Sequence, residues 1–442
     1  MFEVKDKPEM VERALLVRLA FNKRDEDEDI SLLEELEELV RTLGIGVAEL
    51  HLAFSRSMHR KFLCGTGKAD EIVAFARAHE CDCIIFDNEL APSQQREWEE
   101  LSGICVIDRE EVILDIFAQR AQTKEATLQV ELARMQYALP RMARMWNHLD
   151  REGGGGSSGG GGAARGMGEQ QIEVDRRLAR KRIDRTKREL EAVRTQRKTR
   201  RKDREKLDMP HGAIVGYTNA GKSTLLNQLS GSDIMAKDML FATLDTTTRS
   251  IDLPDGQTIL LTDTVGFVRN LPHRLVEAFK STLEEAVLAD FLIHVLDVNS
   301  PEAEKFFDTT MSVLSELGSE DKPMITILNK VDLVTAPRVI EELTERLKDK
   351  SPNILVASAY KNIGIEEILT ACTEVLATRV QKNIYRIPQT DGQHLNQLYQ
   401  EAKVLDTEYE GNDVIITAIV PAIIAGRLKP YLKDQPEEKP EW

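Results

Sequence analysis

The stretch AIVGYTNAGKST (residues 213–224) decides the fold of the second half of the chain, because an apolar strand runs into a glycine-rich turn and a helix start. It matches the pattern GxxxxGK[ST], whose glycines let backbone N–H groups surround phosphates at a helix N-terminus. The pattern predicts that Lys222 bridges the β- and γ-phosphates and acts in catalysis, and that the Ser223 hydroxyl ligates Mg²⁺. The residues expected to contact the nucleotide here are Gly216, Tyr217, Thr218, Asn219, Ala220, Gly221, Lys222 and Ser223.

A second motif, LTDTVGF (261–267), ends another apolar strand. Asp263 stands at the strand's end, where a carboxylate can hold Mg²⁺ through water, and Gly266 has the spacing of an amide that contacts the γ-phosphate. Thr264 and Val265, which lie between these two residues, are included in the predicted site. The next residue is Phe267, where many such enzymes carry a water-orienting glutamine.

A third motif predicts that the base is guanine. MITILNKVD (324–332) ends a strand with NKxD. The Asp332 carboxylate can accept both N–H donors on the guanine edge, which adenine does not present. Asn329 is expected to brace the loop and the base, and the aliphatic stem of Lys330 to cover the ring. Val331 is placed in the same predicted contact.

A fourth motif, ILVASAY (354–360), ends a further strand and offers the backbone of Ser358 and Ala359 to the guanine O6, with Tyr360 beside them. The order and spacing of the four motifs indicate a Ras-like GTPase domain that binds GTP and GDP. A P-loop kinase is disfavoured, because it has no use for a guanine-specific aspartate.

The segment LFATLDTTTRS (240–250) is expected to order only when GTP is bound. One of its threonines must give a hydroxyl to Mg²⁺ and a backbone amide to the γ-phosphate. The position of Thr243 in a long loop after the P-loop favours it for this role, and Thr247 is the alternative. The residues predicted to contact the nucleotide here are Phe241, Ala242, Thr243, Leu244 and Asp245.

Residues 1–108 alternate strand-like and helix-like runs, which predicts a small α/β domain with a largely parallel sheet. In the first expected helix, leucines recur every three to four residues, the period of one helix face. The expected strands are 14–21, 47–54, 82–87 and 103–108, and the expected helices are 31–44, 68–80 and 93–101.

Residues 109–207 are predicted to form a helical arm. One helical run without glycine is expected from Asp108 to about Met142, and a basic helix is expected at 172–206. Between them lies a glycine-rich loop, GGGGSSGGGG at 153–162, which is typical either of an engineered linker or of a natural flexible loop. Two long helices around such a joint indicate an antiparallel pair.

Two domains are predicted to follow the arm, which makes the whole chain a multidomain α/β protein. The GTPase domain is expected at 208–380. A small α+β domain and tail are expected at 381–442, with strands near Ile384 and at 413–420 and a helix between them.

The net charge of −16 conceals a segregated distribution. Between Asp175 and Lys206 there are 16 Lys/Arg against 6 Asp/Glu, a local balance of +10 that leaves −26 for the rest of the chain. A basic arm on an acidic body is attracted to a polyanion, although such a helix can also be simply a solvated face. We predict that 176–206 contacts RNA.

The composition is typical of a cytoplasmic protein. There is no apolar run of about 18 residues that would predict a membrane span, and no secretory signal is visible at the N-terminus. The five cysteines include no CxxC pair and are typical of buried thiols in a reducing compartment.

Over nearly its whole length the chain resembles the HflX family, ribosome-associated GTPases of the translation-factor-related class. The segments that carry the resemblance include FLCGTGKADEI (62–72), DNELAPSQQREWE (87–99), VGYTNAGKSTLLN (215–227), LFATLDTTTR (240–249) and DTVGFVRNLP (263–272). The chain departs from the family pattern at Thr246, where proline is usual, and in a longer glycine segment at 153–162. The family's FATLD threonine matches Thr243, which adds to the case for that residue as the Mg²⁺ ligand.

The resemblance implies an N-terminal α/β domain with a helical arm, a Ras-like domain and a small C-terminal domain. It also implies binding to the large ribosomal subunit, hydrolysis of GTP stimulated by the ribosome, and splitting of stalled or idle ribosomes. ATP binding by the N-terminal domain has been proposed for the family, and CGTGK (64–68) is the natural position for it. The alternative for CGTGK is a tight turn at a helix start.

Phe267 cannot hydrogen-bond a water, so we expect slow hydrolysis by the chain alone. Asn219 lies where related GTPases coordinate a monovalent cation, so K⁺ could supply charge neutralisation; the alternative is that its side chain hydrogen-bonds the loop. Two other function classes are weighed, a GTPase of ribosome assembly or of other RNA, and a protein-directed switch. No RNA-modifying motif supports the former, and the basic arm is unnecessary for the latter.

Overall fold

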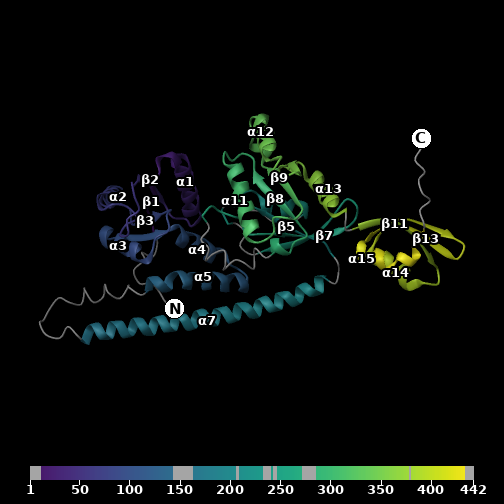
Figure 1. The fold of residues 1–442 in the computed structure, drawn as a ribbon, viewed down its shortest axis with the longest axis horizontal. Helices are drawn as coiled ribbons and strands as arrows, with labels where there is room; N and C mark the ends of the chain where they lie inside the picture. Colours follow the sequence, from purple (N-terminus) through teal and green to yellow (C-terminus); the bar gives the residue numbers. More distant parts are fainter. Residues whose placement is uncertain are drawn as a thin grey trace. The chain divides into compact units, whose positions relative to one another are not determined.

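The computed structural model describes residues 11–142, 163–205, 209–231, 240–241, 246–270, 285–377 and 380–433. The chain folds into two compact units (Figure 1). Unit 1 comprises the described residues of Met1–Lys198, Lys237–Asp245 and Val265–Leu283. Unit 2 comprises those of Thr199–Ala236, Thr246–Thr264 and Glu284–Trp442. Two short segments of the second half of the sequence therefore belong to the first unit.

Unit 1 contains a parallel sheet of strand order β2-β1-β3-β4. Its strands are β1 (Ala14–Ala20), β2 (Val47–Phe54), β3 (Cys83–Phe86) and β4 (Cys105–Asp108). The central strands β1 and β3 are apolar and buried along almost their whole length, as expected for a parallel sheet that is covered on both faces. The predicted parallel α/β domain is confirmed.

Three helices accompany this sheet: α1 (Glu26–Thr42), α2 (Thr66–Ala78) and α3 (Pro92–Ser102). Helix α1 begins five residues earlier than its leucine pattern predicted, with an acidic first turn that suits the positive end of a helix. Its Leu36 and Leu39 are fully buried. One hydrophobic cluster of the unit contains Trp98, which is fully buried and whose ring packs against Phe62 and Phe86.

The single helical run predicted from Asp108 to Met142 is wrong, because the chain forms two helices, α4 (Arg109–Arg120) and α5 (Lys124–Met142). Ala121 leaves the helical region with φ −62° and ψ 115°. The Thr123 hydroxyl then accepts a hydrogen bond from the Ala126 N–H at 3.2 Å, which caps the new helix. Periodicity alone does not reveal a break between two helices with similar faces.

Helix α7 (Ala163–Glu205) begins nine residues before the predicted basic helix. It lies beside α5 (Figure 1), and Leu128 and Leu132 of α5 share a hydrophobic cluster with Ile183 and Leu190 of α7. The glycine-rich loop 153–162 lies outside the described residues.

Unit 2 contains a sheet of strand order β10-β9-β8-β5-β7-β6, in which only β6 is antiparallel to its neighbour. The strands are β5 (His211–Gly216), β6 (Thr247–Asp252), β7 (Thr258–Asp263), β8 (Phe291–Asp297), β9 (Met324–Asn329) and β10 (Ile354–Val356). The helices are α8 (Lys222–Leu229), α11 (Ala303–Glu316), α12 (Pro337–Leu347) and α13 (Ile365–Leu376). This is the predicted Ras-like fold.

Alternate residues of the strands in unit 2 belong to different hydrophobic clusters. Ile325 and Ile327 pack in one cluster with residues of α8 and α13, and Leu328 packs in another with residues of α11 and α12. Because successive strand residues point to opposite faces, the helices cover the sheet on both sides. The carboxyl ends of β5, β7, β9 and β10 carry the predicted nucleotide motifs.

The C-terminal part is a sheet of order β11-β13-β12. Its elements are β11 (Val380–Pro388), α14 (Gly392–Glu401), β12 (Lys403–Glu410), β13 (Asp413–Pro421) and α15 (Ala422–Arg427). The predicted strand–helix–strand pattern missed β12, although the turn at Gly411, with φ 64°, marks a hairpin. Within the described ranges, no helix is long and apolar enough to cross a membrane.

Candidate nucleotide site

The P-loop requires glycine at two positions. Gly216 has φ 145°, and a Cβ placed there would lie 2.3 Å from the carbonyl oxygen of Val295. Gly221 has φ 95°, and a Cβ there would lie 2.3 Å from Nδ2 of Asn329. At these two glycines the P-loop therefore lies too close to β8 and to the last residue of β9 for a side chain to fit.

Lys222, the first residue of α8, is almost completely buried, and its Nζ donates a hydrogen bond to the carbonyl oxygen of Tyr217 at 2.8 Å. Burial lowers the pKa of Lys222 to about 8, although the nearby Asp263 carboxylate acts in the opposite direction. A buried ammonium whose strongest partner is a carbonyl can be better satisfied by an anion. A phosphate beside Nζ would favour the charged form of Lys222.

Ser223 and Asp263 form the group of ligands suited to a divalent cation. The Ser223 hydroxyl donates a hydrogen bond to Oδ2 of Asp263 at 2.6 Å. Asp263 is 1% exposed at the end of β7. A hydroxyl and a carboxylate at the end of a buried strand are hard oxygen ligands, which Mg²⁺ prefers, so the residues present fit this ion.

Asn329, the last residue of β9, hydrogen-bonds both the P-loop and the segment that follows β10. Its Nδ2 donates to the carbonyl oxygen of Ala220 at 2.8 Å, and its Oδ1 accepts from the N–H of Ala359 at 3.0 Å. Asn329 is 2% exposed. The side-chain amide of Asn329 therefore links the P-loop to the fourth motif, and its role toward the base stays a prediction.

Asp332 is oriented by a neighbour from the fourth motif. The Ser358 hydroxyl donates to Oδ1 of Asp332 at 2.5 Å and accepts from the N–H of Lys361 at 3.1 Å. Lys330 adopts φ 65°, and its Nζ lies 2.8 Å from Oδ2 of Asp297. The two strand ends predicted to bind guanine thus share one hydrogen-bonded network.

Other predicted contacts also lie in the described part of the site. Thr264 donates through its hydroxyl to the carbonyl oxygen of Ile214 in β5 at 2.7 Å. Asn219 has φ 60° and is exposed, and its side chain forms no hydrogen bond with another described residue. Tyr217 is buried and stacks on Phe306 of α11, with ring centroids 3.9 Å apart.

The two segments that are predicted to sense GTP, 240–250 and 263–272, are called the switch segments below. The structure describes only part of each. Ala242, Thr243, Leu244 and Asp245 lie outside the described residues, so the choice between Thr243 and Thr247 stays a prediction. Thr247 begins β6 and pairs with Asp263 in the sheet register. Phe267 is 2% exposed. Val265 and Gly266 precede it in the segment assigned to unit 1.

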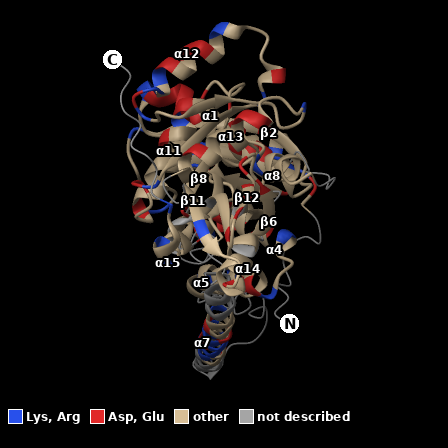
Figure 2. Ribbon diagram, turned by 90° about the vertical axis from the view of Figure 1, so that its right-hand side faces the viewer, with Lys and Arg blue, Asp and Glu red and all other residues tan. Residues whose placement is uncertain are grey.

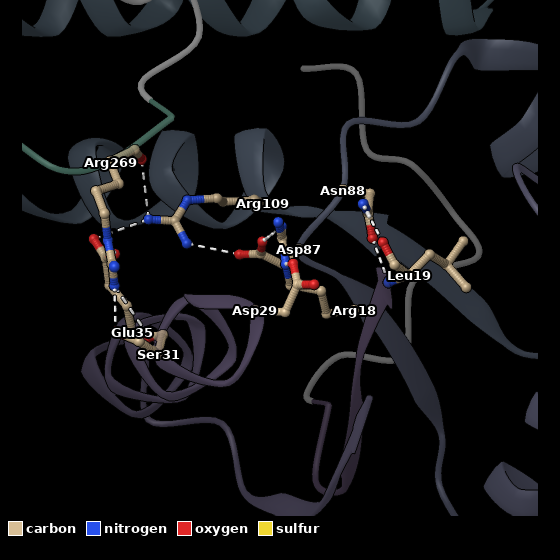
Figure 3. A network of polar contacts seen from close by, with 9 residues as sticks. All are labelled: Arg18, Leu19, Asp29, Ser31, Glu35, Asp87, Asn88, Arg109 and Arg269. Carbon is tan, nitrogen blue, oxygen red and sulfur yellow. Dashed lines mark hydrogen bonds and ion pairs between the residues drawn. The ribbon is translucent and has the colours of Figure 1, made fainter. Parts of the chain in front are cut away.

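Sequence reasoning missed a buried cluster of charges in unit 1 that includes Arg269 of the DTVGFVRNLP stretch (Figure 3). Arg269 pairs with Glu35 of α1, and Arg109 at the start of α4 pairs with Glu35 and with Asp87. The available signal was weak: Asp87 and Arg109 directly follow two apolar strands, where polar residues often serve a site.

The CGTGK segment forms the turn at the start of α2, with Gly65 as the residue before the helix. Nζ of Lys68 lies 2.7 Å from Oε2 of Glu71, one turn further along the same helix. These contacts match the alternative of a tight turn. A second nucleotide site here stays a prediction.

Three family profiles match the chain. "GTP-binding GTPase N-terminal" matches residues 31–118, "GTP-binding GTPase Middle Region" matches 120–204, and "50S ribosome-binding GTPase" matches 211–330. The three ranges cover most of the chain and follow the same order as its predicted parts.

Similar proteins extend over almost the full length. GTPase HflX of Akkermansia muciniphila is 59% identical over 437 residues, covering 98% of this chain and 100% of the relative. GTPase HflX of Escherichia coli strain K12 is 40% identical over 397 residues, covering 89% of this chain and 90% of the relative. A solved structure of a GTP-binding protein from the archaeon Sulfolobus solfataricus in complex with GDP aligns over 83% of this chain and 99% of that chain, with 26% identity and a TM-score of 0.41.

Proposed function

The chain belongs to the HflX family of GTPases, and from this premise we propose that it binds the large ribosomal subunit and separates stalled or idle ribosomes. It is a P-loop enzyme that binds GTP and hydrolyses it to GDP and phosphate. The proposal adds the partner and the purpose of the hydrolysis. The partner also implies that the protein works in the cytoplasm.

The observation that carries the proposal is the basic helix α7. Arg180, Lys181 and Lys187 are exposed, and none of them forms an ion pair with another described residue. Figure 2 shows Lys and Arg recurring along the ribbon of this helix. Free cations on a long helix favour a polyanionic partner such as rRNA, because binding releases condensed counterions. The family description "50S ribosome-binding GTPase" points in the same direction.

The residues proposed for the nucleotide combine the described geometry with the switch segments. We assign Lys222 to the neutralisation of the β- and γ-phosphates and Asp332 to the selection of guanine; the burial of Lys222 and the hydrogen bond from Ser358 to Asp332 support these roles. We assign the amide of Gly266 to the γ-phosphate, and the segment Phe241–Asp245 to the loop that closes on GTP. Mg²⁺, held by Ser223 and Thr243, would neutralise charge that develops on the phosphate oxygens.

Asn219 is proposed to assist this neutralisation with a monovalent cation such as K⁺. Its side chain is exposed within the P-loop and makes no hydrogen bond to another described residue, which disfavours the alternative that it simply braces the loop. Phe267 offers no group that can orient water. We therefore infer low intrinsic turnover that rises when the large subunit orders the switch segments.

Co-sedimentation with purified ribosomal subunits tests the proposal directly. The protein is expected to pellet with large subunits in a non-hydrolysable GTP analogue, less well in GDP, and not with small subunits. Large subunits should raise the steady-state rate of GTP hydrolysis. Equal binding to both subunits in every nucleotide would contradict the proposal, and binding only to immature subunits would favour an assembly factor.

A further inference from the structure

Two cysteines face each other across neighbouring strands of the sheet in unit 1. Cys83 begins β3 and Cys105 begins β4, and the two are register partners in this parallel pair. Neighbouring strands lie about 4.8 Å apart, and the Cα atoms of disulfide-bonded cysteines are usually roughly 4.4 to 6.8 Å apart. Both residues carry thiols in the structure. Their backbone positions therefore suit a disulfide without any change in strand pairing.

The side chains of the two cysteines point to the same face of the sheet. Ile84 and Val106, which directly follow them, pack in one hydrophobic cluster with Trp98. Successive strand residues point to opposite faces, so Cys83 and Cys105 both point away from that cluster. Because the strands are in register, the two thiols are neighbours on the other face.

The remaining cysteines of the chain are not part of this pair. Cys64 and Cys81 belong to the hydrophobic cluster on the opposite face, and Cys372 is buried in unit 2. Burial raises the pKa of Cys64 to about 11. It raises the pKa of Cys372 to about 12. At neutral pH both residues therefore stay thiols, which are poor nucleophiles.

The two paired thiols differ in their access to solvent. Strand β4 is an edge strand of the sheet, and Cys105 is partly exposed there. Cys83 lies in the neighbouring strand and is fully buried. Oxidation by a peroxide begins at a thiol that solvent reaches. Cys105 is therefore the residue that meets the oxidant, and Cys83 is the resolving thiol beside it.

We propose that Cys83 and Cys105 form a reversible disulfide when the protein meets hydrogen peroxide. The Cys105 sulfur attacks one peroxide oxygen, so an S–O bond forms, the O–O bond breaks, and the other oxygen leaves as water with the thiol proton. The Cys83 sulfur then attacks the sulfur of this sulfenic acid. The S–S bond forms, the S–O bond breaks, and the hydroxyl leaves as a second water with the Cys83 proton. The two thiols lose two electrons, which reduce one peroxide to two waters.

A pair of this kind is compatible with the cytoplasmic location proposed above. Disulfides in a reducing compartment are usually transient and often serve as redox sensors. The bond would fasten the edge strand β4 to the interior strand β3 and close a loop that contains α3. A thiol reductant would open it again by exchange.

Peptide mapping of the full-length chain tests the pair. The reduced protein is treated with a small molar excess of hydrogen peroxide, its remaining thiols are alkylated, and it is digested with trypsin and Asp-N protease. Asp-N protease cuts between Cys81 and Asp82, so the neighbouring thiols of Cys81 and Cys83 fall on different peptides. The expected product joins peptide 82–86 to peptide 97–107, with two of the five thiols lost. Dithiothreitol should separate the two peptides.

Single alanine variants provide the controls. Cys83→Ala and Cys105→Ala should each abolish the joined peptide. Cys81→Ala, the matched control two residues from Cys83, should leave it unchanged. In Cys83→Ala the Cys105 sulfur should stop at sulfenic acid, which dimedone traps. Circular dichroism compared with the wild type checks that each variant is folded, and the wild-type map identifies the pair by itself if a variant is not.

Three results would overturn the proposal. The first is a wild-type chain in which peroxide leaves both thiols available to the alkylating reagent. The second is a disulfide that joins Cys105 to Cys81 or to a second chain. The third is oxidation of Cys105 to sulfinic acid while Cys83 stays a thiol, because the two sulfurs then do not meet.

Discussion

The hydroxyl of Ser223 lies 2.6 Å from Oδ2 of Asp263, so the start of α8 and the end of β7 already meet where a divalent cation is expected. Ser223→Ala removes one ligand and leaves the phosphate-binding backbone intact. We expect the Mg²⁺-dependent part of GDP affinity to fall about tenfold, which corresponds to ~1.4 kcal/mol. The affinity for GDP, measured once with Mg²⁺ and once with a chelator in place of Mg²⁺, gives that part as the difference. In the chelator, the GDP affinity of the variant should match that of the wild type. A parallel loss in both conditions would mean that the serine supports only the loop.

Lys222 should make nucleotide binding depend on pH. Burial lowers its pKa from 10.5 to about 8, so the unfolded chain binds more protons than the folded, nucleotide-free chain between pH 8 and pH 10.5. The free energy of unfolding of that form should therefore rise with pH through this window, by up to about 3 kcal/mol from this group. Denaturant titrations at several pH values measure the rise.

Phosphates at Lys222 favour its charged form, so GDP binding at pH 8.5 should take up a fraction of a proton. Calorimetric titrations in two buffers of different ionisation enthalpy detect this uptake. At pH 7 the lysine is already protonated and its contribution should vanish. Lys222→Arg, which carries a charge that does not titrate in this range, should show no such contribution at either pH.

Asp332 should determine the choice of base. Asp332→Asn replaces an acceptor by a donor at the carboxylate that faces the guanine N–H groups, so GDP affinity should fall by at least about tenfold. The same change should favour xanthosine diphosphate, whose edge offers a carbonyl oxygen to the new amide. Ser358→Ala removes only the hydroxyl that orients Asp332 at 2.5 Å. Ser358→Ala should therefore lower GDP affinity less than Asp332→Asn does, and it should leave the preference for guanine unchanged. Competition between GDP and xanthosine diphosphate for each variant distinguishes the two outcomes.

Helix α7 offers two charge variants for a test of ribosome binding, one that removes three unpaired charges and one that removes two paired charges. Neutralising Arg180, Lys181 and Lys187 to Gln should weaken binding to large subunits and lower the slope of log affinity against log salt by roughly 2 to 3. Neutralising Arg182 and Arg185 should have less effect, because these charges already pair with Glu131 and Glu189. GDP affinity should be unchanged in both variants. Equal losses in the two sets would argue against direct RNA contact.

The strands and the nucleotide motifs were predictable because each rests on a local pattern. Apolar runs of four to eight residues placed β1 to β4 within two residues of their ends, and the P-loop spacing placed Lys222 and Ser223 beside Asp263. The break between α4 and α5 was not predictable from the helical spacing of the apolar residues, because it depends on the cap at Thr123. Strand β12 was missed because its alternation is weak and most of its described side chains are exposed.

The contacts of Arg269 with Glu35 and Arg109 could not be predicted, because these partners are distant in the sequence. Glu35 and Arg109 lie 234 and 160 residues from Arg269, respectively. In the sequence each appears as one charge among many, and only the fold brings them to one buried cluster. The roles of Gly266 and Thr243 rest on motif spacing. Spacing predicts which groups contact the phosphate and Mg²⁺, but it does not predict the conformation of the loop that carries them.

Phe241 and Arg269, which both follow residue 208 in the sequence, contact residues of the N-terminal half of the chain within unit 1. A protein shortened to residues 208–442 would keep the P-loop and the guanine-binding strand ends, but would leave Phe241 and Arg269 without Phe117, Glu35 and Arg109. Rates of GTP hydrolysis measured on such a fragment come from a protein that lacks these contacts.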